Sequence, residues 1–317
     1  MTTRREMLVA IAALGVPLAG LAQQAPIPRL GVLASSNLEP ALGFFREGLR
    51  DLGYVEGKNI LLEVRSAEGK SDSLPALAAE LVRLKVDVIV ALATPAAHAA
   101  KNATSTIPIV ISAGDPVGTG LVASLARPGG NITGMSLSTA ELAAKTLELI
   151  REIRPATRSV AVLANATDPF TRFFLEQIQS AGRALGMEIH PVIVRRPEEF
   201  DAVFAQWAKS KVGAVIVQPT LPRNRAIELA LKYRLVSGSP SQAFALEGGL
   251  FAYTGNLRDQ YRRIAIFVDK ILKGAKPADL PLEQPTVFEL VVNMKTARAL
   301  GQTIPKTVLF RADRVIE

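Results

Sequence analysis

Short apolar runs alternate with amphipathic stretches along most of this chain, and this alternation limits the fold more than any other feature. Residues 29–35 form an apolar run, and residues 41–52 place their large apolar side chains on one helical face before Gly53 ends the helix. The run VDVIVAL at 86–92 is typical of a strand buried on both faces of a parallel sheet. The pattern predicts an α/β fold whose sheets are covered by helices.

The same order of elements starts again in the second half of the chain. RLGVLASSN matches SVAVLANAT, RDLGYVEGKNI matches RALGMEIHPVI, and VDVIVALATP matches GAVIVQPTLP, at an offset of about 130 residues. Any two α/β stretches share part of this order. A steady offset over three strands nevertheless favours two similar, doubly wound parallel-sheet lobes over one long sheet. The Gly- and Pro-rich stretches at 108–136 and after Lys273 predict crossings between the lobes.

Residues 1–22 are typical of a secretion signal. Two arginines precede an uncharged, largely apolar run from Met7, and small residues at Gly20 and Ala22 suit a cleavage point. The run is shorter than the roughly 20 residues of a membrane-spanning helix. The alternative, a buried N-terminal helix, conflicts with the proline inside the run. We expect a mature chain that begins near Gln23 and diffuses freely in a periplasm. Sec and twin-arginine export both stay open, and no cysteine is present for lipid attachment.

The side chains available exclude several kinds of chemistry. The chain has no cysteine, and its two histidines, His98 and His190, leave little for a metal site or a Ser/His/Asp triad. No Gly-x-Ser-x-Gly, His-Glu-x-x-His or calcium-loop motif occurs, and GDPVGTG at 114–120 lacks the spacing of a nucleotide loop. The net charge of +8 is not clustered, and aromatic residues make up only 5%. We expect no cofactor, no metal, no catalytic residue and no nucleic-acid partner.

Three long strings carry a resemblance to a known family. They are SAGDPVGTGLVASLARPGGNITGMS, ELAAKTLELIREIRPATRSVAVLANATDP and VDKILKGAKPADLPLEQPTVFELVVNMKTARALGQTIPKTVLFRADRVIE. With them the chain resembles the periplasmic substrate-binding proteins of ABC transporters with the type I fold, in a family with relatives linked to tryptophan and other amino acids.

The resemblance implies both an architecture and a role. The two lobes would be joined by three crossings, with lobe one at residues 28–132 and 254–284 and lobe two at residues 133–253 and 285–317. A monomer would capture a small organic solute, an amino acid or a related compound, in the cleft between the lobes. It would deliver the solute to the permease of an ABC importer in the inner membrane and catalyse no reaction.

The location of a site follows from the sheets. Ligands of open parallel sheets bind beyond the carboxyl ends of the strands, where helix N-termini present free N–H groups. Two lobes that face each other at these ends form a clamp. The candidate ligand-binding residues are the polar residues after the predicted strands: Ser35, Ser36, Asn37, Thr94, Asp115, Asn165, Thr167, Gln218, Thr220, Tyr253 and Asn256.

An amino acid needs donors around its carboxylate and an acid near its ammonium. We expect Asp115 to be that acid. The donors that we expect from the two lobes are Ser36, Thr94, Asn165 and Thr167. Such residues also cap helices, so Asp115 and Asp168, each before a proline, have a structural alternative. Asn256 has the same alternative, and Tyr253 is either a core residue or a stacking wall.

Two other functions stay open at this point. A doubly wound scaffold can carry an enzyme that acts on a nucleotide or a sugar, because a fold alone does not decide function. The effector domain of a transcription regulator shares the two-lobed architecture, but it needs a helix-turn-helix where this chain has a secretion signal. The binding protein is the prediction that we carry to the structure.

Overall fold

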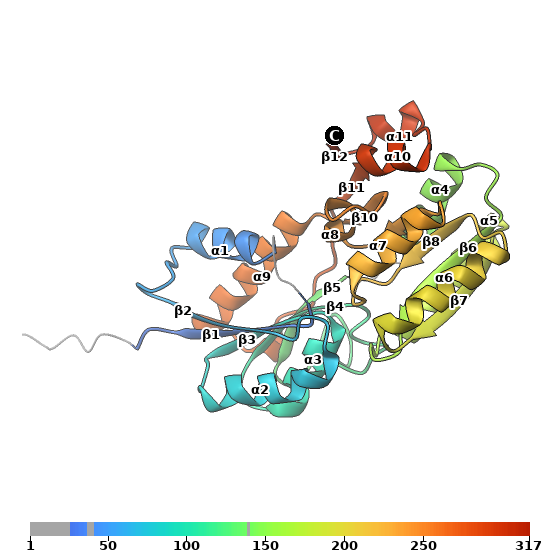
Figure 1. Ribbon diagram of the computed structural model, residues 1–317. Helices are drawn as coiled ribbons and strands as arrows, with labels where there is room; N and C mark the ends of the chain where they lie inside the picture. The colour runs from blue at the N-terminus through green and yellow to red at the C-terminus, as the bar shows by residue number, and fades with distance from the viewer. Residues whose placement is uncertain (1–25, 37–40, 138–139) are drawn as a thin grey trace, which may run out of the picture.

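The computed structural model describes residues 26–36, 41–137 and 140–317. Within these ranges, strands and helices alternate and form two α/β lobes (Figure 1). The predicted secretion signal and Asn37 lie outside the described residues. No helix of the described ranges is long and apolar enough to cross a membrane.

The sheet of the first lobe is parallel throughout. Its described strands lie in the order β2-β1-β3-β4-β5, and each strand is parallel to its neighbours. The strands are β1 (Arg29–Ala34), β2 (Leu61–Ser66), β3 (Val88–Leu92), β4 (Ile109–Ala113) and β5 (Ile132–Ser136). Every residue of β3, β4 and β5 is buried, as expected for a sheet that is covered on both faces.

Helices cover both faces of this first sheet. Phe45 and Ile264 lie in the apolar cluster on one face, and Leu81 and Ala96 lie in the cluster on the other face. The helices of the first face are α1 (Ala41–Asp51) and α9 (Leu257–Leu272), and those of the second are α2 (Leu74–Arg83), preceded by the short η1 (Ser71–Ser73), and α3 (Thr94–Ala103). Because α9 comes late in the chain, the first lobe is completed only after the chain has passed through the second.

The sheet of the second lobe is parallel except at one pair of strands. Its described strands lie in the order β12-β11-β10-β9-β8-β6-β7, and only β10 and β11 are antiparallel. The strands are β6 (Ser159–Asn165), β7 (Glu188–Val194), β8 (Ala214–Val217), β9 (Val236–Ser239), β10 (Phe251–Gly255), β11 (Phe288–Asn293) and β12 (Arg314–Ile316).

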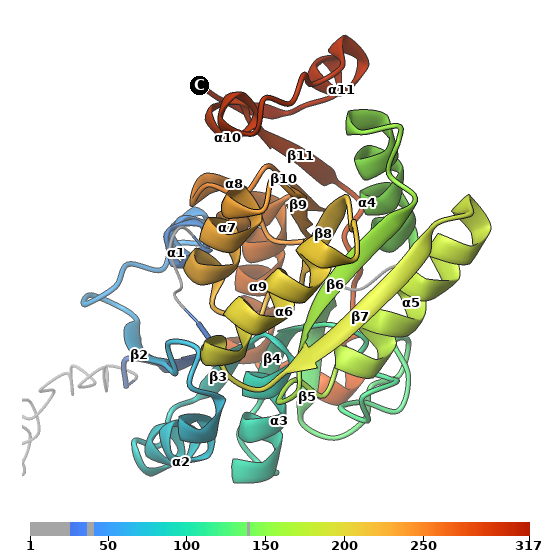
Figure 2. The same ribbon diagram turned by 45° about the vertical axis from the view of Figure 1, so that its right-hand side comes forward.

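Helices also lie on both sides of this second sheet, with α5 on one side and α6 on the other (Figure 2). Trp207 of α6 packs edge-on against Phe204 in the core. The helices are α4 (Ala140–Ile153), α5 (Thr171–Leu185), α6 (Phe200–Lys209), α7 (Arg223–Lys232), α8 (Gln242–Leu246), α10 (Met294–Leu300) and α11 (Lys306–Phe310), with the short η2 (Pro197–Glu199) and η3 (Pro277–Asp279).

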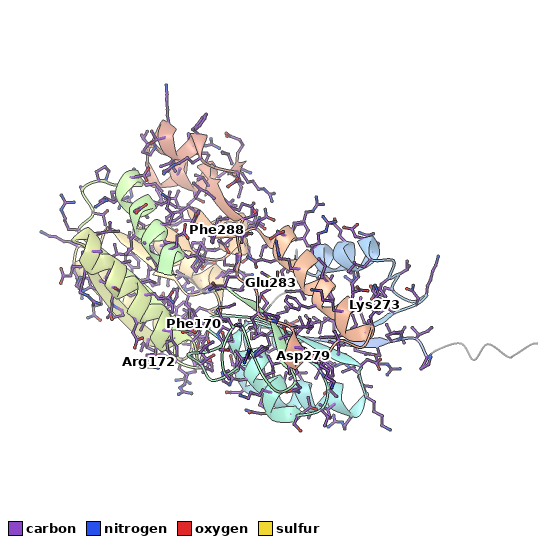
Figure 3. All side chains as sticks on the ribbon, turned by 180° about the vertical axis from the view of Figure 1, so that it is seen from behind. Phe170, Arg172, Lys273, Asp279, Glu283 and Phe288 are labelled. Carbon is purple, nitrogen blue, oxygen red and sulfur yellow. The ribbon has the colours of Figure 1, made fainter. Side chains whose placement is uncertain are left out.

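Three segments connect the lobes, as expected. They are the link from β5 to α4, the junction of β10 and α9 at Asn256, and residues 282–287 before β11. The second and third lie side by side, because the Asn256 N–H donates to the Val287 carbonyl at 2.8 Å. The third also pairs with β5, where the Ser136 N–H donates to the Glu283 carbonyl at 2.9 Å. Figure 3 labels Glu283 between the two lobes.

Two of the expected lobe boundaries differ from the structure. The boundary between residues 253 and 254 falls inside β10, which pairs with β11 from Phe251 to Gly255 and so lies entirely in the second sheet. The boundary between residues 132 and 133 falls inside β5, which pairs with β4 over its whole length. A strand cannot be divided between two sheets while all of its residues pair in one, so β5 lies entirely in the first sheet. The chain leaves this lobe only after Ser136.

Candidate functional site: the cleft between the lobes

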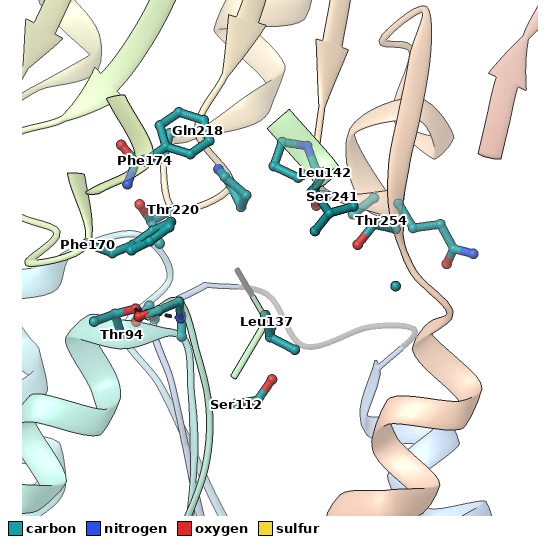
Figure 4. A pocket seen from close by; sticks show the side chains of 18 of the residues that line it. Thr94, Ser112, Leu137, Leu142, Phe170, Phe174, Gln218, Thr220, Ser241 and Thr254 are labelled. Carbon is teal, nitrogen blue, oxygen red and sulfur yellow. Dashed lines mark hydrogen bonds between the residues drawn. The ribbon is translucent and has the colours of Figure 1, made fainter. Parts of the chain in front are cut away.

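A cavity of about 250 Å³ lies between the two lobes. Its walls come from residues at or just after the carboxyl ends of strands in both sheets, which is where the sequence predicts a ligand. Figure 4 shows Thr94, Phe170 and Thr220 toward one end of this cleft and Ser241 and Thr254 toward the other. We call the second the hinge end, because Thr254 immediately precedes the crossing from β10 to α9.

On the lobe-one wall, α3 begins with an uncapped N-terminus. Ala93 precedes the helix with a φ of 76°, a conformation that is rare outside glycine, and its methyl group cannot cap. The side chain of Thr94 is engaged elsewhere, because its Oγ1 accepts the Gly114 N–H at 3.1 Å. Pro95 has no N–H and the Ala93 N–H donates to the Ser112 carbonyl at 2.8 Å, so the Thr94 N–H is the donor that this turn offers at the cavity wall. The helix dipole favours a negative charge there.

Ser35 lies on the same wall and has a buried hydroxyl without a partner. The residue is 5% exposed, and its Oγ bonds to no group in the described part of the chain. An unsatisfied buried polar group costs about 1–3 kcal/mol. This cost is removed when a solute in the cleft bonds to the hydroxyl.

The opposite wall carries the buried carboxylate of Asp168. Its Oδ1 accepts the Phe170 N–H at 2.9 Å, and its Oδ2 accepts the Gln218 amide and the Thr220 hydroxyl, both at 2.8 Å. Burial raises the pKa of Asp168, and these hydrogen bonds oppose the increase. No lysine or arginine of the described residues forms an ion pair with it, and the cleft-lining Arg223 donates twice to Glu247 instead.

Neighbouring polar side chains hold Asp168 in one orientation. The Gln218 Oε1 accepts the Asn165 N–H at 2.8 Å and the Thr171 hydroxyl at 3.0 Å, so the Gln218 amide must turn its Nε2 toward Asp168. Asn165 also donates from Nδ2 to the Thr220 hydroxyl at 3.2 Å. Every member has its direction set by another, so the carboxylate is preorganised.

Two phenylalanines border the cleft beside this carboxylate. Phe170 and Phe174 have ring centroids 6.0 Å apart, and both line the cavity. Phe170 reaches across to lobe one, where a Cβ added to Gly114 would lie 2.7 Å from its ring. The lobes therefore touch at this point.

The hinge end combines apolar side chains with the amides of Gln242 and Gln260. Leu137, Leu142 and Tyr261 line it, and Tyr261 is buried. Gln242, the first residue of α8, lines the same end and is 6% exposed. Its amide nitrogen donates to Glu289 of β11 at 2.8 Å.

The structure brings some of the predicted residues together at the cleft. Those that line it are Ser35, Ser36, Thr94, Gln218 and Thr220. Asn165 lies directly behind them, where it bonds to Thr220. These positions agree with the rule that the carboxyl ends of parallel strands form the site.

Other predicted residues lie outside the lining of the cavity. Asp115, the acid that the sequence favours, accepts the Gly118 N–H at 2.9 Å and closes its own turn. Thr167 donates to the hydroxyl of Ser71 in lobe one at 3.2 Å, a bond between the lobes. Tyr253 stacks on Phe288, with ring centroids 5.9 Å apart.

Asn256 caps α9, because its Oδ1 accepts the Asp259 N–H at 3.0 Å. This is the structural alternative that the sequence offered for the residue. Its Nδ2 donates to Glu289 at 3.2 Å.

Sequence reasoning missed several cleft residues. The sequence predicts Asp168 only as a helix cap. The structure contains the capping bond, from the Phe170 N–H to Oδ1, but the other oxygen, Oδ2, belongs to the hydrogen-bond network at the cleft. Phe174 and Gln242 lie on helices. At such positions, an apolar helix face or a helix cap accounts for the residue type as well as a binding site does. The only available signal was the position of Asp168 three residues after β6. No group of His, Cys, Asp and Glu that could hold a metal ion occurs in the described ranges.

A family model described as ABC transporter substrate binding protein matches residues 33–316. The match spans both lobes, all three crossings and the cleft. The chain belongs to the ABC transporter substrate-binding protein family. The predicted family and the predicted type I periplasmic binding fold are both confirmed.

Known proteins similar to this substrate-binding protein include one named for its ligand. A tyrosine-binding protein of Clostridioides difficile (strain R20291) is 27% identical over 279 residues, which cover 83% of this chain and 77% of that protein. Two solved structures each align with 91% of this chain and 99% of their own. A conserved domain protein from Vibrio cholerae has a TM-score of 0.84 at 27% identity, and an ABC domain in complex with L-Trp from Streptococcus pneumoniae has a TM-score of 0.82 at 26% identity.

These findings establish the role at the level of the family. The protein is a solute-binding component of an ABC transporter, and the similar proteins with named ligands bind solutes. The cleft between its lobes has the size and position of a site for a small molecule.

Proposed function

We propose that this substrate-binding protein holds an α-amino acid with an aromatic side chain in its cleft, with the ammonium group on Asp168. The observation that carries the proposal is a buried carboxylate, 5% exposed, that lines the cleft without an ion pair to any lysine or arginine of the described residues. A buried charge is costly unless it is paired. A solute ammonium supplies the missing partner, whereas an anionic or purely apolar solute does not.

The carboxylate of the solute has its own donors on the opposite wall. The uncapped first turn of α3 and the partnerless Ser35 hydroxyl lie on lobe one. The acid and the donors thus lie on different lobes, so one zwitterion bonds to both. This arrangement makes the solute itself the link that holds the lobes together, with the Thr94 N–H and Ser36 as further contacts of its carboxylate.

The side chain of the solute points to the hinge end. Leu137, Leu142 and Tyr261 supply an apolar lining there, and the cavity of about 250 Å³ is small enough to select a single amino acid. An aromatic side chain also agrees with the printed ligands of similar proteins, tyrosine and L-Trp.

In the cell, the loaded protein would deliver the solute to the permease of an ABC importer. It would act in the periplasm as a monomer, without catalysis, after removal of residues 1–22. Lobe one would consist of residues 28–136 and 256–284, and lobe two of the remainder. N-terminal sequencing of the protein from a periplasmic fraction should find a start near Gln23, and an intact Met1 on cytoplasmic protein would contradict this location.

Titration calorimetry on protein that has been unfolded, dialysed and refolded tests the ligand. L-tryptophan and L-tyrosine should bind, and at least one should bind more tightly than L-leucine or L-glutamate. Indole-3-propionate lacks the ammonium and tryptamine lacks the carboxylate, so each should bind at least about tenfold more weakly than L-tryptophan. Equal affinity for L-tryptophan and indole-3-propionate would reject the role of Asp168.

A further inference from the structure

Glu289 joins the wall of the cleft to the hinge. Its Oε1 accepts the Gln242 amide at 2.8 Å, and its Oε2 accepts the Asn256 amide at 3.2 Å. Gln242 lines the hinge end of the cleft, and Asn256 lies in the crossing from β10 to α9. The carboxylate has no ion pair with any lysine or arginine of the described residues, so these two amides are its polar partners.

The chemistry of these groups fixes how the two amides point. An ionised carboxylate can only accept hydrogen bonds, so each amide must turn its NH₂ group toward Glu289. The orientation of the Asn256 amide is also fixed by its second hydrogen bond. Its Oδ1 accepts the Asp259 N–H, so Oδ1 and Nδ2 cannot exchange places. For Gln242, which lines the cleft, the consequence is that Oε1 points away from Glu289.

We infer that Glu289 is a positioning residue that fixes a hydrogen-bond acceptor, the Oε1 of Gln242, at the hinge end of the cleft, and that the solute carries a donor on the distal part of its side chain. The statement about the solute rests on the proposed function, because it takes the side chain to reach the hinge end. The statement that Glu289 orients the Gln242 amide does not rest on the proposed function. A site built to bond a solute O–H or N–H rejects the analogue that lacks it, since the acceptor is then left unpaired.

Nuclear magnetic resonance of the ligand-free protein tests the amide directly. The side-chain NH₂ signals of Gln242 and Asn256 should exchange slowly with water in the wild type. In Glu289→Gln, the new amide can accept from one partner only, so at least one of the two signals should lose its protection. Glu283→Gln is the matched control, because Glu283 lies in the crossing that leads into β11 and pairs with Arg263 at 2.7 Å rather than with Gln242. It should leave both signals unchanged.

Binding of two matched pairs of solutes tests the consequence. L-tyrosine differs from L-phenylalanine by one hydroxyl, and L-tryptophan differs from L-3-benzothienylalanine by the indole N–H. In at least one pair, the member with the donor should bind about tenfold more tightly to the wild type. Glu289→Gln should reduce this preference about three- to tenfold, and Glu283→Gln should keep it.

A double exchange separates orientation from general damage. In the double variant Gln242→Glu with Glu289→Gln, the amide at position 289 donates to the carboxylate at position 242 and accepts from the Asn256 amide. Both hydrogen bonds and the net charge of the pair are then the same as in the wild type, and residue 242 again has an oxygen free to accept a hydrogen bond. The preference for the donor-bearing solute should return with them. Fast exchange of the wild-type Gln242 amide, or a preference untouched by Glu289→Gln, would overturn the inference. If the wild type binds none of the four amino acids, the proposed function fails, and the amide signals still decide the role of Glu289.

Discussion

Asp168 is a buried carboxylate in the wall of the cleft, and burying its charge without a cation costs free energy. Asp168→Asn keeps the shape and removes the charge, so the solute ammonium loses a charge-assisted bond. We expect amino-acid binding to weaken by about 1.5–3 kcal/mol, which is tenfold or more, and the stability of the variant relative to the wild type to depend on pH as described below. Calorimetry and a melting curve on the same variant measure both.

Asp115→Asn is the control for this substitution. Asp115 is also followed by proline, but its carboxylate closes a turn outside the lining of the cavity. The affinity of this variant should match that of the wild type. A loss of binding in Asp115→Asn, with wild-type affinity in Asp168→Asn, would exchange the roles of the two acids.

The stability of the solute-free protein should depend on pH through Asp168. Burial raises the pKa of this carboxyl in the folded protein above its usual 3.8, so the folded state binds the proton more tightly than the unfolded chain does. The free energy of unfolding that the group contributes therefore falls as pH rises from the unfolded to the folded pKa, and stays low above it. Melting curves between about pH 3.5 and 7 should show Asp168→Asn gaining on the wild type with rising pH. A difference that is constant with pH would show that the buried carboxyl has an ordinary pKa.

At the scale of elements, the start of α5 meets the turn after β4 across the cleft. Phe170 lies so close to Gly114 that an added Cβ would be 2.7 Å from its ring. Gly114→Ala should push the lobes apart at this edge and weaken solute binding about tenfold, with little change in melting temperature because the added methyl group lies at the contact between the lobes and outside the core of the first lobe.

Removing the Phe170 ring should remove the loss of affinity that the methyl group of Gly114→Ala causes. In a Phe170→Ala background, Gly114→Ala should cost no further affinity, which a double-mutant cycle by calorimetry measures. If the two losses simply add, the ring and the glycine do not interact in the bound state, and the contact is unimportant for closure.

Element by element, the sequence predicted the buried strands and the long amphipathic helices well, and it missed those with weak patterns. β3 and β4 are continuous apolar runs, and α5 and α9 have clear apolar faces. β9 reads VSGS, with two serines and a glycine, so no apolar run marks it. It is a strand because β8 and β10 on either side offer their backbone groups to it.

At the scale of the whole molecule, a solute that bonds to both lobes should hold them closed. Small-angle scattering should show a smaller radius of gyration with saturating L-tryptophan or L-tyrosine, whichever binds more tightly. The same solute at about 100 times its Kd should stabilise the protein by about 2.7 kcal/mol. Unchanged scattering with a verified tight ligand would contradict closure.

Much of this molecule follows from its sequence alone. The alternation of periods predicted α/β layers, and the repeat at an offset of about 130 residues predicted two lobes. The strand ends predicted where a ligand lies, because parallel strands end at the same edge of a sheet. These properties depend on residue type and spacing, which a sequence displays directly.

The tertiary structure decided which acid faces the cleft. Asp115 and Asp168 are indistinguishable in the sequence, since each follows a buried strand and precedes a proline. Asp115 has a positive φ of 34° and turns its carboxylate back to Gly118, whereas Asp168 meets the side chains of Gln218 and Thr220 from the next strand of its sheet. The direction of a loop side chain depends on its backbone angles and on partners that lie 50 and 52 residues away along the chain. Neither is visible until the strands are assembled side by side.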